Sequence, residues 1–381
     1  MSARISQASR ALATAAAAAL LLACLAPRLA AAQAAEPPAI PPIASVVPLG
    51  VVQQNRLVNC RDGQYSALIK GRVYWTFGDT CLQKGGVAGD TFIDNSMAWS
   101  TGTNASTGLS LSRDWADAQG VPKRLIPLTE GELAFNAAHA PNELALWPGQ
   151  LVPDLARNRA LVFFGTVYRG ANIGFRGVGG GIAVASLSLK EVSRPVQNPD
   201  PNAAEPTYLW LPGERVYTNG YLVEGDMLYT YAGEPRFLST LVHVARVPLA
   251  DALDKSKWRY YTGNGVWSED AQASKSVYTG GAAGDTLFWS DYLGLYVTVY
   301  QTYLNNDVYY RVAHHPEGPW SAQAYMFTAE QGTEVSYAAR VHPGYAENGG
   351  QVQYITYAKT TGFLRQELPL VQVSFGPPAP H

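Results

Sequence analysis

Apolar and polar residues alternate in short runs along nearly the whole chain after residue 50. The side chains of Leu295, Val297 and Val299 would share one face of an extended segment, a period of two that is typical of β-strands. The pattern predicts an all-β fold, with short helical turns only at 112–119 and 249–256. Comparable strand-like runs, rich in β-branched and aromatic residues, occur at 64–69, 72–77, 159–168, 181–189, 227–232, 238–247, 292–303, 307–314 and 351–359.

The strand-like runs gather into five clusters, and 36 Gly and 25 Pro provide the tight turns that many short strands need. Each cluster has roughly 50–70 residues, and one propeller blade of four short strands needs about 40–50. A β-sandwich or a jelly roll would not require five clusters. We therefore expect a five-bladed β-propeller, with clusters at 57–110, 120–190, 205–250, 255–320 and 323–376.

The first residues have the pattern of a secretory signal peptide. Arg4 and Arg10 precede an apolar run at 11–26, which is shorter than the ~20 residues of a membrane span, and small residues suited to cleavage follow. No later stretch is apolar enough to cross a bilayer. We expect a secreted or periplasmic protein without a transmembrane segment, divided into a signal peptide at 1–34, a Pro/Ala-rich linker at 35–50, one β-domain at 51–376 and a tail at 377–381.

A second interpretation of the leader involves Cys24. The Leu-Leu-Ala-Cys sequence that ends at Cys24 is similar to the lipobox of bacterial lipoproteins, so a lipid anchor at Cys24 would place the protein on the cell envelope. The small residues after it favour simple secretion. Either way Cys60 and Cys81 remain in the exported domain, and two cysteines in an oxidising compartment predict one disulfide.

Charge and motifs exclude several classes of function. The 28 basic and 30 acidic residues are balanced and form no basic stripe, so no nucleic-acid partner is expected. His314, His315 and His342 lack the spacing of a zinc site, and no Gly-x-Ser-x-Gly elbow occurs. We expect no metal at the site and no organic cofactor, although the sequence leaves open a structural calcium ion in a central channel.

The first predicted hairpin places two pairs of residues opposite each other. Its strands flank Lys70 and Gly71, a two-residue turn with glycine where a positive φ is needed. Counting outward from this turn, the aspartate at 62 faces the aspartate at 79. Two positions further out, Cys60 faces Cys81. Opposed Cβ atoms lie ~4.5–5.5 Å apart, which is within reach of a disulfide after small adjustments.

The opposed aspartates are the leading candidates for chemistry. Like charges opposite each other destabilise a sheet, but in a partly dry cleft they give one carboxyl group a high pKa and leave the other ionised. Glycoside cleavage needs such an acid and such a base or nucleophile. Alternatively, Asp62 caps a turn and Asp79 binds loop amides. The register does not decide between the short carboxyl separation of retaining enzymes and the longer one of inverting enzymes.

The segments around this hairpin resemble a known family. The Arg-Asp-Gly at 61–63 and the Trp-Thr-Phe-Gly-Asp-Thr at 75–80 are similar to the opening of secreted five-bladed propellers that were catalogued as a domain of unknown function and are associated with endo-D-arabinanase activity. The resemblance implies hydrolysis of an arabinan-like polysaccharide, with Asp62 and Asp79 as the catalytic pair. The flanking cysteines depart from the family pattern. Further similar segments lie at 94–99, 146–149, 318–321 and 342–343.

Other residues in or near these segments are candidates for binding the polysaccharide. Arg61 precedes the first aspartate, Asp94 and Asn95 follow the hairpin, and Glu143 and Trp147 lie at the start of the second cluster. A further carboxylate such as Asp94 or Glu143 would tune the pKa values of the pair. The alternative functions are a carbohydrate-binding propeller without catalysis and an envelope-associated scaffold. Both would make the two aspartates dispensable for chemistry.

Overall fold

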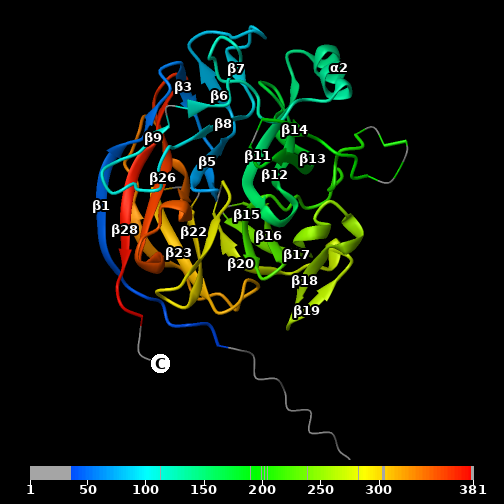
Figure 1. Ribbon diagram of the computed structural model, residues 1–381. Coiled ribbons are helices and arrows are strands. Elements are labelled where there is room, and N and C mark those ends of the chain that lie inside the picture. The colour runs from blue at the N-terminus through cyan, green and yellow to red at the C-terminus, as the bar shows by residue number, and fades with distance from the viewer. Residues whose placement is uncertain are drawn as a thin grey trace, which may run out of the picture. The chain divides into compact units, whose positions relative to one another are not determined.

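The computed structural model describes residues 36–111, 113–188, 190–198, 200, 202–203, 205–237, 239–281, 283–302 and 305–378 (Figure 1). The signal peptide expected at 1–34 and the candidate lipidation site Cys24 lie outside the described residues. Pro37–His381 forms one compact unit, and everything below concerns this unit. Its regular secondary structure is mainly β-strand, with one α-helix and a few 3₁₀ turns in the described part, and the predicted all-β class is confirmed.

Most strands belong to five antiparallel sheets of four or more strands each, which follow one another along the chain. The first sheet contains β4 (Tyr65–Ile69), β5 (Arg72–Phe77), β8 (Ser96–Trp99) and β10 (Arg113–Asp114). The second contains β11 (Glu143–Asp154), β12 (Arg159–Gly170), β13 (Gly174–Ser186) and β14 (Val192–Ser193). The third contains β15 (Asn219–Glu224), β16 (Met227–Arg236), β17 (Ser239–Pro248), β18 (Arg259–Gly263), β19 (Val266–Ser268) and β20 (Ser276–Gly280).

The remaining strands form the last two large sheets and two small ones. The fourth sheet contains β21 (Thr286–Ser290), β22 (Leu295–Gln301), β23 (Asp307–Ala313) and β24 (Ala324–Thr328). The fifth contains β1 (Ile43–Val51), β25 (Tyr337–Val341), β26 (Val352–Gly362), β27 (Arg365–Glu367) and β28 (Pro369–Phe375). The small sheets pair β2 (Gln53–Gln54) with β9 (Ser110–Leu111), and β3 (Val58–Arg61) with β6 (Thr80–Leu82) and β7 (Phe92–Ile93).

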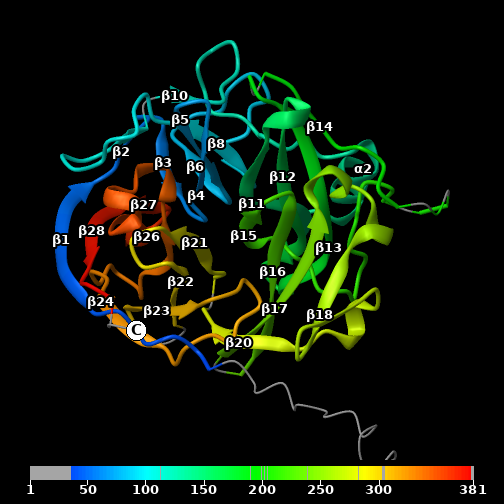
Figure 2. The ribbon, with the colours of Figure 1, turned by 60° about the horizontal axis from the view of Figure 1, so that its bottom comes forward.

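One strand of each large sheet faces a common centre (Figure 2). These inner strands are β4, β11, β15, β21 and β25, and they contact one another in chain order. The last one also meets the first, because the Gln64 side chain donates a 2.6 Å hydrogen bond to the Ala338 carbonyl. The ends of the inner strands therefore bring residues from all five sheets together.

The segment expected to be a linker is a strand over much of its length. Residues Ile43–Val51 form β1, which pairs antiparallel with β28 and covers an edge that would otherwise expose unpaired backbone groups. Just before β1, the Gly376 amide donates a 2.7 Å hydrogen bond to the Pro42 carbonyl. Both ends of the β-domain are thus joined in one sheet, a pairing between distant segments that local pattern does not reveal.

The core lies between neighbouring sheets and is rich in aromatic side chains. Trp75, Trp210 and Trp258 are fully buried. The Trp75 indole donates a 2.9 Å hydrogen bond to the Tyr345 hydroxyl, so its polar atom keeps a partner in the interior. This packing holds the inner strands in place.

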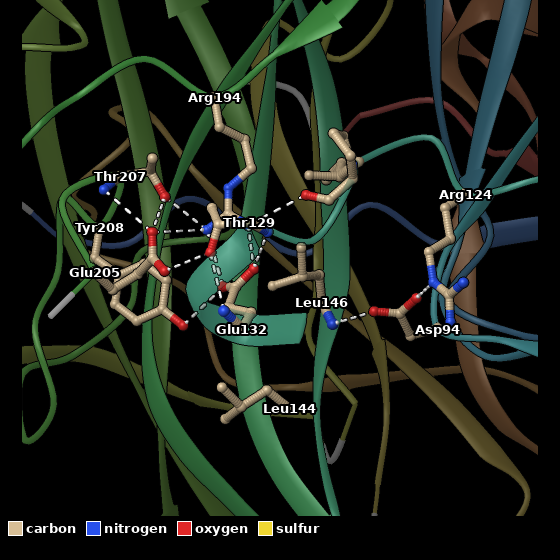
Figure 3. A network of polar contacts seen from close by, with 12 residues as sticks. Asp94, Arg124, Thr129, Glu132, Leu144, Leu146, Arg194, Glu205, Thr207 and Tyr208 are labelled. Carbon is tan, nitrogen blue, oxygen red and sulfur yellow. Dashed lines mark hydrogen bonds and ion pairs between the residues drawn. The ribbon is translucent and has the colours of Figure 1, made fainter. Parts of the chain in front are cut away.

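The one α-helix of the described residues, α2 (Glu130–His139), was not predicted. Its start carries a capping box: the Thr129 hydroxyl accepts a hydrogen bond from the Glu132 amide, and the Glu132 carboxylate accepts one from the Thr129 amide. Figure 3 shows how Glu132 also pairs with Arg194, which lies on the loop after the second sheet. Elsewhere the expected turn at 249–256 is two 3₁₀ turns, Leu249–Asp251 and Lys255–Lys257. No helix occurs at the described residues 113–119.

Candidate active site

The predicted register of the first hairpin is confirmed. Its strands β4 and β5 pair from Ile69 opposite Arg72 outward, with Lys70 and Gly71 in the turn at positive φ. At the far end of the hairpin β3 pairs with β6, and Cys60 lies opposite Cys81. These cysteines form a disulfide with their Cα atoms 4.9 Å apart, as expected.

The two aspartates lie between these paired segments, on the same hairpin. The Gly78 amide donates a 2.9 Å hydrogen bond to the Asp62 carbonyl, which keeps the two chains together at the level of the acids. A Cβ atom at Gly78 would lie 2.9 Å from Asp62 Oδ1, so glycine at this position leaves space for the carboxylate. The hairpin therefore presents two acidic side chains at one place, next to a backbone that makes room for them.

Each aspartate has its own set of hydrogen-bond donors. The Tyr337 hydroxyl donates a 2.6 Å hydrogen bond to Asp62 Oδ2, and the same hydroxyl accepts one of 2.8 Å from the Gln366 side chain. Asp79 Oδ1 accepts a hydrogen bond of 3.1 Å from the Trp147 indole and forms an ion pair with Arg169. One carboxylate is thus held by a neutral donor and the other by a cation.

These surroundings perturb the two acids differently. Burial raises the pKa of Asp62 to about 6, the Tyr337 hydrogen bond opposes the rise, and the negative charge of Asp79 adds to it. Burial also raises the pKa of Asp79, against the opposing effects of the Arg169 cation and the Trp147 hydrogen bond. A carboxyl group with a pKa near 6 exchanges protons readily near neutral pH, which suits an acid catalyst.

A cavity of about 370 Å³ opens beside Asp62 and is within the size range of small-ligand sites. Residues of all five large sheets, or of the segments leading into them, line it. From the last sheet Tyr337 and Arg340 contribute, and Trp147 and Pro148 contribute from the second. The other lining residues are Asp62, Gly63, Tyr65, Gly78, Gly149, Gly165, Val167, Thr218, Asn219, Gly233, Pro235, Thr240, Gly281, Ala283, Gly284 and Ala338.

A second hollow, of about 450 Å³, lies beside Asp79. Glu143 and Arg169 line it, and Arg169 Nη2 lies 2.7 Å from Glu143 Oε1. Of the candidate binding residues, Trp147 and Glu143 are therefore brought together with the aspartate pair. The structure places the first at the cavity and the second at the neighbouring hollow.

Asp94 lies behind the site rather than in it. Its side chain is buried, pairs with Arg124 at 2.7 Å and accepts a 2.6 Å hydrogen bond from the Leu146 amide (Figure 3). This bond fixes the backbone next to Trp147. The negative charge of Asp94 also contributes to raising the pKa of Asp79, so Asp94 acts on the site through its neighbours.

Arg61 and Asn95, both expected to bind substrate, are instead structural. Arg61 is fully buried, and its guanidinium pairs with Asp114 at 2.8 Å and lies over the Phe77 ring. Asn95 is also buried, and its amide exchanges hydrogen bonds with the backbone of Ile126. Their proximity to the motif in sequence suggested a role at the cavity, but alternation along the chain directs both side chains into the interior.

Three residues at the site were missed by sequence reasoning. Tyr337 and Arg340 come from β25, and Arg169 comes from β12. Buried Arg340 donates a 2.8 Å hydrogen bond to the Gly284 carbonyl, and its guanidinium lies 4.3 Å from the centre of the Tyr65 ring. None of the three is in a recognisable motif; only a prediction of which strands of different sheets meet would have found them.

The described residues contain no group of three or more His, Cys, Asp or Glu side chains placed to hold a metal ion. Among the same residues, no helix has the length and apolar character needed to span a membrane.

Comparisons with known proteins place this fold and this chain. No curated protein matches the sequence. Among solved structures, a putative hydrolase from Bacteroides ovatus is similar with 17% identity and a TM-score of 0.53, over 86% of each chain. A family 117 glycoside hydrolase from Zobellia galactanivorans is similar with 9% identity and a TM-score of 0.50, over 87% of this chain and 90% of that one. At such identities the likeness concerns the fold alone. A family model matches residues 51–361, and the chain therefore belongs to the family described as Domain of unknown function (DUF5005).

Proposed function

We propose that this chain is an exported five-bladed β-propeller that hydrolyses glycosidic bonds in a polysaccharide, with Asp62 and Asp79 as its catalytic carboxyl groups. The observation that carries the proposal is the pair itself. Two acids lie on facing segments of one hairpin. Asp62 lines a cavity formed by all five sheets, Asp79 lines the neighbouring hollow, and different donors hold them. Five consecutive sheets with contacting inner strands support the count of five blades, and the fold shared with a glycoside hydrolase supports the class of reaction.

In this proposal Asp62 is the general acid. Its pKa of about 6 keeps part of the population protonated near neutral pH, and it would donate that proton to the leaving glycosidic oxygen. The Tyr337 hydroxyl, itself held by Gln366, fixes the direction of the carboxyl group. After bond cleavage Asp62 is left as a carboxylate.

Asp79 is the second carboxylate, acting as base or nucleophile. The Arg169 cation and the Trp147 indole stabilise its ionised form. It would either take the proton of an attacking water or attack the anomeric carbon itself, and the two routes differ in the stereochemistry of the product. No organic cofactor takes part in either route.

The hairpin and its flanking segments resemble the propeller family that is associated with endo-D-arabinanase activity. This resemblance supports an arabinofuranosidic linkage as the bond that is cleaved. The disulfide between Cys60 and Cys81 supports a secreted or periplasmic location. Lipidation at Cys24 is the alternative location on the envelope. Loss of radiolabelled palmitate from the protein upon Cys24→Ala would establish the anchor, and absence of label in the wild type would exclude it.

The test is release of reducing sugar from arabinan, arabinogalactan, xylan and fructan by the mature wild type, Asp62→Asn and Asp79→Asn. Asp251→Asn is the matched control, because Asp251 is exposed and remote in sequence from the hairpin. The proposal expects release from one polymer, abolished in both site variants and unchanged in the control. Equal glycan binding by all four proteins without any release would instead establish a non-catalytic carbohydrate-binding propeller.

A further inference from the structure

The hollow beside Asp79 has an unusual lining. Its volume is about 450 Å³, and two exposed phenylalanine rings, Phe92 and Phe175, share it with Arg169 and Glu143. Phe175 is 69% exposed and Phe92 is 40% exposed. Isolated exposed apolar residues are common on protein surfaces, but here two of them flank one concave, charged surface. We call this hollow, lined by Asp79, Phe92, Pro141, Glu143, Arg169, Gly170, Ala171, Gly174 and Phe175, the aromatic groove.

The groove is built on regular sheet structure. Glu143, Arg169 and Phe175 form one row across β11, β12 and β13, because Arg169 is the cross-strand partner of both other residues. The Arg169 guanidinium lies 5.0 Å from the centre of the Phe92 ring, which brings β7 to the same place. The ion pair and this contact orient the polar floor between the two rings.

The groove adjoins the cavity, because residues that line the two hollows contact each other. Asp79 lines the groove, and the Trp147 indole donates a hydrogen bond to Asp79 while Trp147 also lines the cavity. The Trp147 and Phe175 rings pack with their centres 5.4 Å apart. A chain bound with one unit in the cavity would therefore meet Phe175 as it passes Asp79.

Two further exposed phenylalanines lie on segments that also contribute residues to the site. Among the described residues only four phenylalanines are exposed, and the two outside the groove are Phe237 and Phe363, at 94% and 92%. Phe237 lies two residues beyond Pro235, which lines the cavity. Phe363 lies in the turn between β26 and β27, and β27 carries the Gln366 that binds Tyr337. The exposed rings thus belong to segments that also build the site.

The charges of the groove indicate what kind of glycan it accepts. One guanidinium, Arg169, is shared by two carboxylates, Asp79 and Glu143, so its charge is already compensated. An anionic sugar would meet an excess of negative charge, whereas neutral sugars offer hydroxyl donors to the carboxylates and apolar C–H faces to the rings.

We infer that the aromatic groove binds the sugar units next to the cleaved bond, and that its ligand is a neutral glycan chain extending beyond the cavity. This inference rests on the proposed function for the position of the bond. It adds a binding site, in which Phe175 stacks on a sugar ring, and a preference for long neutral chains over short or acidic ones.

The experiment compares two neutral substrates, 4-nitrophenyl arabinofuranoside and a series of arabinofuranosyl oligosaccharides of increasing length. Phe175→Ala should lower kcat/KM for the longest oligosaccharide about tenfold, which corresponds to about 1.4 kcal/mol, because the variant loses both the stacking of the ring and the apolar area that it buries. The aryl glycoside should be hydrolysed within twofold of wild type. Tyr325→Ala removes a 55% exposed aromatic ring on the outer strand β24 and is the control.

A calorimetric measurement separates the groove from the reaction. Binding of the longest oligosaccharide to Asp62→Asn should weaken about tenfold when Phe175→Ala is added. If no protein hydrolyses anything but this loss of binding occurs, the proposed function fails and the groove stands. Unchanged kcat/KM and unchanged binding for Phe175→Ala, or an equal loss with the aryl glycoside, would overturn the groove while leaving hydrolysis intact.

Discussion

Replacing Tyr337 by phenylalanine tests the assignment of Asp62 as the acid. Burial raises the pKa of Asp62, and the Tyr337 hydroxyl, which donates a 2.6 Å hydrogen bond to this carboxylate, opposes the rise, so that the pKa is about 6. A hydrogen bond to a charged group is worth about 1.5–3 kcal/mol, and one pKa unit corresponds to about 1.4 kcal/mol. Tyr337→Phe should therefore raise the pKa of Asp62 by about 1–2 units, because the carboxylate loses its donor while remaining buried.

The pH dependence of kcat/KM gives the direction of this shift. An acid catalyst works only while protonated, so activity is lost as the pH rises through its pKa. The basic limb of the profile should move to higher pH by about 1–2 units in Tyr337→Phe. The acidic limb reports the group that must be ionised, and it should move far less because Tyr337 has no hydrogen bond to Asp79.

The control for this substitution is Tyr325→Phe, which removes a hydroxyl from a residue on β24 that bonds Thr328 rather than the site. Its profile should match wild type. An upward shift of the acidic limb in Tyr337→Phe, with the basic limb unchanged, would refute the roles given to the two aspartates. Asp62 would then be the group that must be ionised, and Asp79 the acid. An unchanged profile in Tyr337→Phe would mean that Asp62 does not govern either limb.

Three other perturbations follow from the same contacts. Burial raises the pKa of Asp62 from 3.8 to about 6, so ionising this group costs the folded state nothing below pH 3.8 and its full amount above pH 6. Asp62→Asn should therefore raise the free energy of unfolding, measured in urea, by at most about 3 kcal/mol at pH 7 and by little at pH 3.5. The disulfide joins residues 21 apart, so replacing Cys60 and Cys81 by serine should cost about 3 kcal/mol, also measured in urea, and no loss would show that the bridge is dispensable. Asp94→Asn removes a charge that raises the pKa of Asp79, so the acidic limb of kcat/KM should move to lower pH, and a move to higher pH would contradict this coupling.

The first hairpin could be predicted from sequence because its geometry is local. A two-residue turn fixes the register of both strands, and every pair out to Cys60 and Cys81 follows from that one position. The same locality explains the prediction of an all-β fold. The missed helix also had a local signal, since Thr129 and Glu132 have the spacing of a capping box.

Contacts between distant segments could not be predicted in this way. Strand β1 completes the last sheet from the other end of the chain, and a Pro-rich surrounding concealed its role. Tyr337 meets Asp62 across 275 positions and Arg169 meets Asp79 across 90, so neither contact has a sequence spacing to reveal it. Arg61 and Asn95 show the opposite error, because neighbours of the key residues in sequence point away from them in space.

The candidate site is also where the sequence departs from what stability alone would favour. Opposed aspartates repel each other, and both pKa values are raised because the carboxylates have lost water. The surrounding structure offsets this cost with donors from other sheets: a tyrosine for Asp62, and an indole and a cation for Asp79. Donors that came only from the hairpin would indicate a local capping role for the acids. Because three distant strands supply them instead, the arrangement requires the whole domain, and such a dependence is expected of a site selected for chemistry rather than for the turn that carries it.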